Sequence, residues 1–120
     1  MRLTGTEVDL LAHAMSAAVK RHETAAANLA NANTPGFKAK EVRFEASFRA
    51  ALAEGPKAAL AVRPEVVLAE GLDEKSDGNN VLAEREYGLM QKNALVFNVM
   101  SAALRQKLAA MRHAISGSAR

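Results

Sequence analysis

The chain has 120 residues, three histidines and no cysteine, which excludes disulfides and thiolate metal sites. Aromatic residues make up only 4% of the chain. This scarcity and the abundance of alanine indicate helices packed closely along their length, without a large aromatic core. No apolar run approaches the ~20 residues that span a bilayer, and the N-terminus does not resemble a cleavable secretion signal.

Charge is unevenly distributed, although the net charge is only +3. Residues 41–80 carry five basic and eight acidic side chains, whereas residues 81–120 carry six basic and two acidic ones. The basic side chains are spread along the chain and form no dense patch. We therefore expect no binding to nucleic acid.

The first 33 residues predict a long helix. Thr6 is expected to cap its start, with Glu7 and Asp9 in the first turn, where the helix dipole favours negative charge. Apolar and small residues then recur at alternating spacings of three and four, which is a heptad seam. This seam consists of Val8, Leu11, Met15, Ala18, His22, Ala25, Leu29 and Ala32. Because half of it is small or polar, the helix needs several neighbours.

This helix is expected to end near Asn33, because the ring of Pro35 disfavours a helical conformation at Thr34. Pro35 and Gly36 suit the two central positions of a type II turn. Three asparagine amides nearby can bond the unpaired carbonyls of a helix end or of a neighbouring chain. They belong to Asn28, Asn31 and Asn33.

Residues 34–79 predict a small and irregular middle segment. Phe44, Phe48 and Leu52 are spaced four apart and favour a short helix ending at Gly55. Residues 60–68 are rich in β-branched side chains and predict one or two short extended segments. Residues 71–80 read as a polar loop. The segment is too small to bury enough apolar surface on its own.

Residues 80–117 predict a second long helix. Asn80 would cap its start, and Glu84 and Glu86 would be the acidic residues of its first turns. Gly117 would end it. Its expected seam is Tyr87, Met90, Ala94, Phe97, Ser101, Leu104, Leu108, Met111 and Ile115. A second stripe consists of Leu95, Val99, Ala102, Ala103 and Ala110. Together these make an apolar face wider than one partner helix covers. A lone hairpin would expose part of it, which marks an interaction surface.

These patterns predict a mainly α chain with one domain, residues 1–120. Two long terminal helices, residues 1–33 and 80–117, would form an antiparallel coiled-coil hairpin, and residues 34–79 would supply a small irregular or short β segment between them. The sequence offers no nucleophile motif and no glycine-rich phosphate loop. Its histidines are not clustered on either helix. We therefore expect no enzyme activity, no cofactor and no metal site.

The stretch ANLANANTPGFKA, residues 26–38, resembles the N-terminal signature of the rod and hook axial proteins of the bacterial flagellum. That signature reads roughly N-x-A-N-x-x-T-x-G-[FY]. The matching positions, with the proline of the turn, are Asn28, Ala30, Asn31, Thr34, Pro35, Gly36 and Phe37. Two further strings, DGNNV at residues 77–81 and NALVFN at residues 93–98, are similar to the proximal-rod members of that family.

The resemblance implies a structural subunit of the basal-body rod in the periplasm, exported through the flagellar type III apparatus without a cleaved signal peptide. Its helices would polymerise to transmit torque and enclose the export channel. Implied partners are copies of itself, other rod proteins, the adaptor between rod and export gate, and the export apparatus. The residues expected in these helix contacts are Val8, Leu11, Met15, Leu29, Met90, Phe97, Leu104, Leu108, Met111 and Ile115.

Two alternatives stay open at this point. Phe44 and Phe48 have the spacing of a segment that the family is thought to present to the export gate, but the same spacing suits core packing in any amphipathic helix. Likewise, a small helical-hairpin adaptor that pairs with one protein and does not polymerise would show similar periodicity. A rod subunit should be poorly ordered at its ends as a monomer, whereas an adaptor hairpin should be cooperatively helical.

Overall fold

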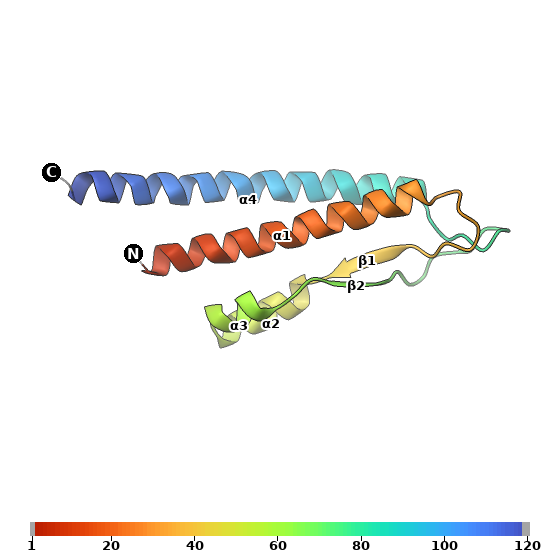
Figure 1. Cartoon of the computed structure of the whole chain (residues 1–120), viewed down its shortest axis with the longest axis horizontal. Coiled ribbons are helices and arrows are strands. Elements are labelled where there is room, and N and C mark those ends of the chain that lie inside the picture. Colours follow the sequence, from red (N-terminus) through yellow and green to blue (C-terminus); the bar gives the residue numbers. More distant parts are fainter. Residues whose placement is uncertain (1, 119–120) are drawn as a thin grey trace.

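Helix α1, Arg2–Ala30, is the central element of the fold. The computed structural model describes residues 2–118 and arranges them in three layers (Figure 1). Helix α4, Ala83–Ser118, packs on one side of α1, and an arm built from residues 40–68 lies on the other. The radius of gyration of 18.4 Å exceeds the ~14 Å of a globular chain of this length. The molecule is therefore elongated, measuring 69 × 27 × 15 Å.

The two long helices run antiparallel, with both chain ends at the same end of the molecule (Figure 1). Contacts along their length fix this direction. Glu7 near the start of α1 pairs with Lys107 at 2.6 Å, and farther along α1 the carbonyl of Ala18 accepts a hydrogen bond from Asn93. The prediction of a mainly α chain with two long terminal helices and a small β segment is confirmed.

The predicted ends of these helices need correction. Helix α1 begins at Arg2, so Thr6 lies inside it and is not its cap; no proline precedes Thr6 to stop the helix from extending. At the start of α4, the amide of Glu86 donates to the carbonyl of Leu82, and Asn80 is not the cap. Gly117 lies within α4, which continues to Ser118. Residues 1, 119 and 120, which the predicted single domain includes, lie outside the described part.

The predicted type II turn after α1 is confirmed. The amide of Phe37 donates to the carbonyl of Thr34 at 3.2 Å, and Gly36 has a φ of 75° at the third position, where this turn needs a positive value. The turn meets the loop before α4, because the amide of Gly36 donates to the carbonyl of Asp77 at 2.9 Å.

The arm contains α2, Glu45–Glu54, α3, Pro56–Ala61, and two short strands, β1, Lys40–Arg43, and β2, Glu65–Leu68. The predicted helix α2 and the extended segment β2 are confirmed. Helix α3 and strand β1 were not predicted. Pro56 occupies the first turn of α3, where its missing amide costs nothing. Strand β1 forms because it pairs antiparallel with β2, with Val42 opposite Val66.

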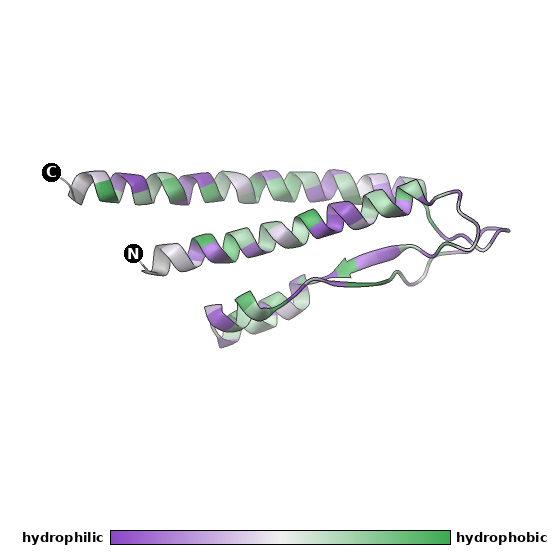
Figure 2. Cartoon of the chain, viewed as in Figure 1, coloured by the Kyte–Doolittle hydropathy of each residue, from purple (hydrophilic) through white to green (hydrophobic). Residues whose placement is uncertain are grey.

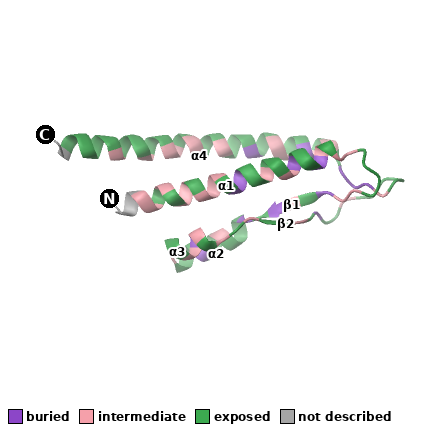
Figure 3. Ribbon diagram, viewed as in Figure 1, coloured by how far each residue is buried: buried purple, intermediate pink, exposed green. Residues whose placement is uncertain are grey.

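The buried core is small and lies where α1, the arm and the start of α4 meet (Figure 3). One cluster packs Ala17 of α1 against Val42 and Phe44, and a second joins Ala39, Ala69 and Val81. Beyond this region the C-terminal half of α4 is half-buried or exposed. Hydrophobic residues occur along the whole of α4 nevertheless (Figure 2). The single chain therefore leaves much of the apolar surface of α4 in water.

Two glycines should respond oppositely to the same substitution. A Cβ at Gly36 would meet no neighbour, but its positive φ strains an L-residue, so Gly36→Ala should destabilise the fold by about 1–2 kcal/mol. Gly88 lies inside α4 with open space around it, and nothing in the single chain explains it. Gly88→Ala should therefore stabilise the fold by up to about 1 kcal/mol. Urea unfolding followed by circular dichroism would measure both changes, and equal signs would contradict the turn assignment.

Candidate functional site: the signature turn and the helix faces

Asn28 ties three elements together from a fully buried position. Its side chain is 1% exposed, and its Nδ2 donates to the carbonyl of Lys40 and to Oε1 of Glu86, each at 2.8 Å. Its Oδ1 accepts from the amide of Lys40 at 3.0 Å. Only a side chain with both donors and an acceptor can make all three bonds. Asn28 thus joins α1 to β1 and to the first turns of α4.

Asn79, in the loop before α4, closes the end of α1. Its Nδ2 donates to the carbonyls of Asn31 and Thr34, each at 2.8 Å, and its Oδ1 accepts from the amide of Val81. The last carbonyls of a helix have no partner within it, so Asn79 supplies one. Its neighbour Asn80 accepts from the amide of Ala39 at 2.6 Å. Side-chain hydrogen bonds from Asn79 and Asn80 therefore hold this loop against the segment that follows α1.

The three expected signature amides have different surroundings. Asn31 donates from Nδ2 to the carbonyl of Ala27 at 2.8 Å, which confirms that an asparagine bonds a carbonyl of the helix end. Asn28 instead bonds the arm and α4. Asn33 is exposed. The asparagines of the turn and those of the 77–81 loop therefore form one network, although more than forty positions separate Asn31 from Asn79.

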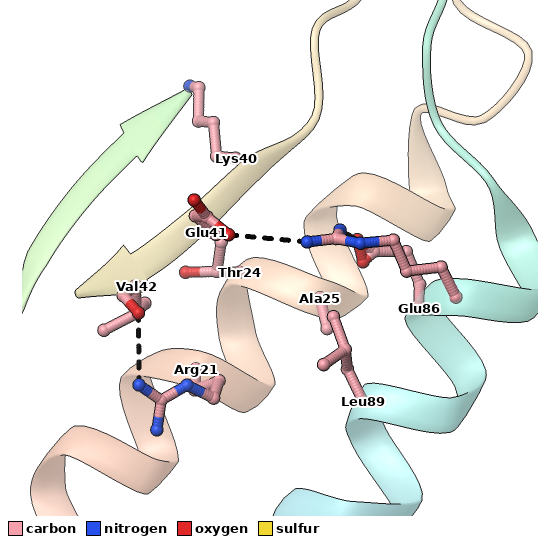
Figure 4. Close-up of a pocket in the computed structure, with 9 residues that line it drawn as sticks. Arg21, Thr24, Ala25, Lys40, Glu41, Val42, Glu86 and Leu89 are labelled. Atoms are coloured by element: carbon pink, nitrogen blue, oxygen red, sulfur yellow. Dashed lines mark hydrogen bonds and ion pairs between the residues drawn. The ribbon is translucent and has the colours of Figure 1, made fainter. Parts of the chain in front are cut away.

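Glu86 is buried, contrary to its expected role as a plain first-turn acid of α4. Its side chain is 1% exposed, and its Oε1 accepts from Asn28 and from Arg85, which lies 3.0 Å away. Arg85 also reaches Glu41 of β1 at 3.4 Å. Arg85 thus pairs with both carboxylates. The three residues line a cavity of about 80 Å³, and Figure 4 shows Glu41 and Glu86 there. Within residues 2–118, Oε2 of Glu86 has no hydrogen-bond partner.

A second polar residue, Asn93, lies in the contact between the long helices. It is buried, and its Nδ2 donates to the backbone carbonyl of Ala18 at 2.8 Å. Glu86 and Asn93 are seven residues apart and therefore occupy one heptad position on the side of α4 that faces α1. The hydrophobic pattern missed both residues, because a polar side chain at a seam position looks like a surface residue in the sequence.

Comparison with known proteins supports the same assignment as the signature. Residues 10–38 match the sequence profile of the flagella basal body rod protein family; this segment covers most of α1 and its terminal turn. Over an alignment of 120 positions, the chain is 28% identical to the flagellar basal body rod protein FlgB of Aeromonas hydrophila, covering 88% of this chain and 89% of that relative. The chain is therefore similar to flagellar basal-body rod proteins.

Along the seam expected on α1, the large apolar side chains are half-buried, and Ala18 and Ala25 are buried. The half-buried residues are Val8, Leu11, Met15 and Leu29. His22, also expected on this seam, is exposed.

On α4, two of the predicted seam positions lie one residue away from the positions that are buried. Glu86 and Asn93 are buried, whereas their neighbours Tyr87 and Ala94, expected in the seam, are exposed. The other expected positions up to Met111 that are half-buried are Met90, Phe97, Ser101, Leu104 and Met111. Leu108 and Ile115 are exposed in the single chain.

Phe44 and Phe48 pack against α1 in the folded chain. Phe44 is buried, and its ring stacks on that of Phe48 with centroids 4.9 Å apart. His13 of α1 lies against both rings, at 5.6 and 6.0 Å, and its Nε2 is 2.5 Å from the carbonyl of Val62. These contacts attach the arm to α1. A role of the two rings in export remains a prediction.

Two further features are absent from residues 2–118. No group of three or more histidine, aspartate or glutamate side chains is arranged to hold a metal ion. No described helix is long and apolar enough to cross a membrane.

Removal of the Asn28 amide should destabilise the fold strongly. Asn28→Ala would leave Oε1 of Glu86 and both backbone groups of Lys40 without this partner, at an expected cost of about 2–4 kcal/mol in the free energy of unfolding. Asn33→Ala, at an exposed position of the same signature, should change it by less than about 0.5 kcal/mol. Urea denaturation would measure both variants. Equal effects would show that the buried network does not hold the turn.

An ion pair between α1 and α2 should make stability depend on acid pH. Arg21 contacts both carboxylate oxygens of Glu45, at 2.5 and 2.7 Å. Partial burial raises the pKa of Glu45, but the hydrogen bond from Arg21, a backbone hydrogen bond and the positive charges of Arg21 and Lys92 outweigh it and leave the pKa below 4.5. Because the folded-state pKa is depressed, this contribution is present above pH 4.5 and disappears as the pH falls through the lower value.

The stability difference between the wild type and Glu45→Gln should therefore be largest near neutral pH and shrink by about pH 3. Denaturant midpoints measured across this range would test it. Glu23→Gln is the matched control, because Glu23 is exposed and lies 4.0 Å from Lys20 in its ion pair. A Glu45→Gln difference that stays constant with pH would contradict the proposed contribution of the Arg21 pair.

Proposed function

We propose that this chain is a proximal-rod subunit of the FlgB type that polymerises through its terminal helices. The relative from Aeromonas hydrophila supports this assignment, since the similarity extends over nearly the whole of both chains. The matched family segment ends at the turn that the buried asparagines hold. A rod subunit of this type would carry load through helix contacts and would need no catalytic site.

The observation that carries the proposal is the exposed apolar surface of α4. Six large apolar side chains are exposed on it over most of its length: Tyr87, Leu95, Val96, Val99, Leu108 and Ile115. Burying each such side chain in an interface is worth about 1.5–3 kcal/mol. Helix α1 covers one side of α4 only, so other subunits must cover the rest. A helix with apolar positions on several sides is typical of packing among several neighbours.

In the proposed rod, α1 and α4 would lie side by side as the inner wall around the export channel, and torque would pass through many close contacts between helices. The partners would be copies of this chain, other rod proteins, the rod-to-export-gate adaptor and the export apparatus. The subunit would leave the cytoplasm without a cleaved signal and assemble in the periplasm. Because Phe44 and Phe48 pack on α1, their recognition by the export gate would require the arm to be detached or unfolded.

A deletion strain complemented with variants would test the proposal. Deletion should abolish swimming and rods in isolated basal bodies, and the wild-type gene should restore both. Ile115→Asp places a charge on an exposed position, so the purified variant should keep its helicity and unfolding midpoint yet fail to restore rods. Leu104→Asp, at a half-buried position, should lose stability as well, because burying a charge is costly.

Rods in the deletion strain would contradict the rod assignment and favour the alternative of a helical-hairpin adaptor that does not polymerise. Normal rods with Ile115→Asp would show instead that this end of α4 is not an assembly surface.

A further inference from the structure

A mostly apolar groove of about 450 Å³ runs along one flank of the contact between α1 and α4. Its lining includes Ala18 and Val19 of α1 and Asn93, Ala94 and Phe97 of α4. Ala18 and Asn93 are buried and are bonded to each other, so the groove continues the contact between the two helices outward. Val19 is 46% exposed. Within residues 2–118, only α1 and α4 line this groove.

The arm lies on the other flank of α1 and does not cover the groove. Ala17 and Val19 are the chain neighbours of Ala18, so at about 100° per residue they lie on either side of it around α1. Ala17 packs against Val42 and Phe44 of the arm, whereas Val19 lines the groove. A cover for the groove would therefore come from another chain.

Leu95 and Val99, which we call the ridge of α4, lie on the opposite flank of that helix. They are one helical turn apart, and they are 65% and 63% exposed. From Asn93, which faces α1, they lie roughly 160° and 120° around the helix in one sense. Ala94, at the groove, lies about 100° from Asn93 in the other sense. The ridge therefore points away from the groove of its own chain and cannot fill it.

The ridge and the groove lie at the same level along α4, because Leu95 comes between Ala94 and Phe97, which line the groove. A second copy placed alongside, parallel and without a shift along the helix axis, would therefore bring its ridge to the groove of the first. Side chains one turn apart would then pack between two helices, as ridges pack into grooves in helical proteins. The one carboxylate of the groove, Glu23, would meet no like charge, because α4 has no acidic residue after Glu86.

Two other exposed apolar side chains of α4, Tyr87 and Leu108, lie on the flank of the groove. They are roughly 120° and 60° around the helix from Asn93, in the same sense as Ala94. A parallel neighbour that reaches the groove presents its opposite flank, so its own Tyr87 and Leu108 face away. These side chains therefore extend the receiving surface, and the ridge is the apolar feature of α4 that meets it.

A contact between ridge and groove is also the one that repeats. Two ridges in a two-fold contact would leave both grooves open, and two grooves would leave both ridges exposed. When a ridge enters a groove, each added copy again presents one free ridge and one free groove. Such a heterologous contact builds a ring or a helical assembly, whereas a two-fold contact stops at a dimer. The proposed rod needs the repeating kind.

We propose that the ridge of one copy packs into the groove between α1 and α4 of a neighbouring copy. The contact would bury Leu95 and Val99 against Val19, Ala94 and Phe97, with the two copies parallel and at the same level. This inference rests on the proposed rod function and names the surfaces through which copies of the chain meet.

Cysteine cross-linking tests the contact directly, because the native chain has no cysteine. Val19→Cys and Leu95→Cys, combined in one chain, should form disulfide-linked dimers and longer ladders in isolated basal bodies on mild oxidation. Neither single variant should form them. The two thiols cannot bond within one chain, because they lie on opposite flanks of the helix pair. Labelling of each purified single variant with a maleimide should show that both thiols are accessible in the free chain.

Dimers of Leu95→Cys alone would overturn the proposal, because they would place two ridges together. Ladders from Val19→Cys combined with Leu52→Cys would also overturn it, because exposed Leu52 belongs to α2 and the arm would then fill the groove. The absence of cross-links from the double variant Val19→Cys and Leu95→Cys, in basal bodies that contain it and in cells that swim, would overturn it and leave the rod function standing. If the wild-type chain is missing from basal bodies, or if the deletion strain still builds rods, the rod function itself fails.

A pair of opposite charges provides a second test that needs no new thiol. Val19→Asp should lose incorporation into rods, as should Leu95→Lys, while each purified variant keeps its helicity because both positions are exposed. The two changes together should restore incorporation at least in part, because aspartate and lysine would then meet across the contact. Leu52→Asp is the matched control, since Leu52 is 42% exposed and Val19 46%, and it should have no effect. Failure of the double variant to recover with its fold intact, or equal loss with Leu52→Asp, would contradict the contact.

Discussion

The buried hydrogen bonds of Asn28 and Asn79 are the interactions on which the rest of the structure depends. Helix α1 ends near the end of the molecule opposite the N- and C-termini (Figure 1). The turn after α1, the loop before α4 and the first turns of α4 are held together there. Asn79 satisfies the carbonyls of Asn31 and Thr34, and Asn28 links Glu86 to β1. Because neighbouring backbone groups would otherwise be buried without partners, loss of one amide is far costlier than loss of an exposed one.

This polar junction matters more here than in a compact domain, because the apolar core is small. Its buried hydrophobic residues are mostly alanines, with Phe44 the largest. Close packing of small side chains lets α1 approach α4, but each contact removes little apolar area from water. In the proposed rod, neighbouring subunits would add stability by covering the exposed apolar side chains of α4. The small core, the reliance on buried hydrogen bonds and the large exposed apolar faces therefore all follow from a composition rich in alanine and poor in aromatic residues.

The sequence predicted the elements that follow from local chemistry. The helical period marked α1 and α4, proline and glycine marked the turn at Thr34, and the spacing of Phe44, Phe48 and Leu52 marked α2. It missed β1, because four residues with three charges do not look like a strand until Glu65–Leu68 lies beside them. It also misplaced two of the nine α4 seam positions by one residue, because Glu86 and Asn93 occupy buried positions that an apolar pattern does not register.

The sequence by itself thus determined the class of fold, the two long helices, the turn between α1 and the arm, and the family signature, since each depends on residues close together in the chain. Only the tertiary structure decided which asparagine bonds which carbonyl, that Glu86 is buried, and that Arg85 of α4 reaches Glu41 of the arm. The reason is physical. A hydrophobic period reports which side chains avoid water, whereas a buried polar group is stable only when a partner distant in sequence is in place.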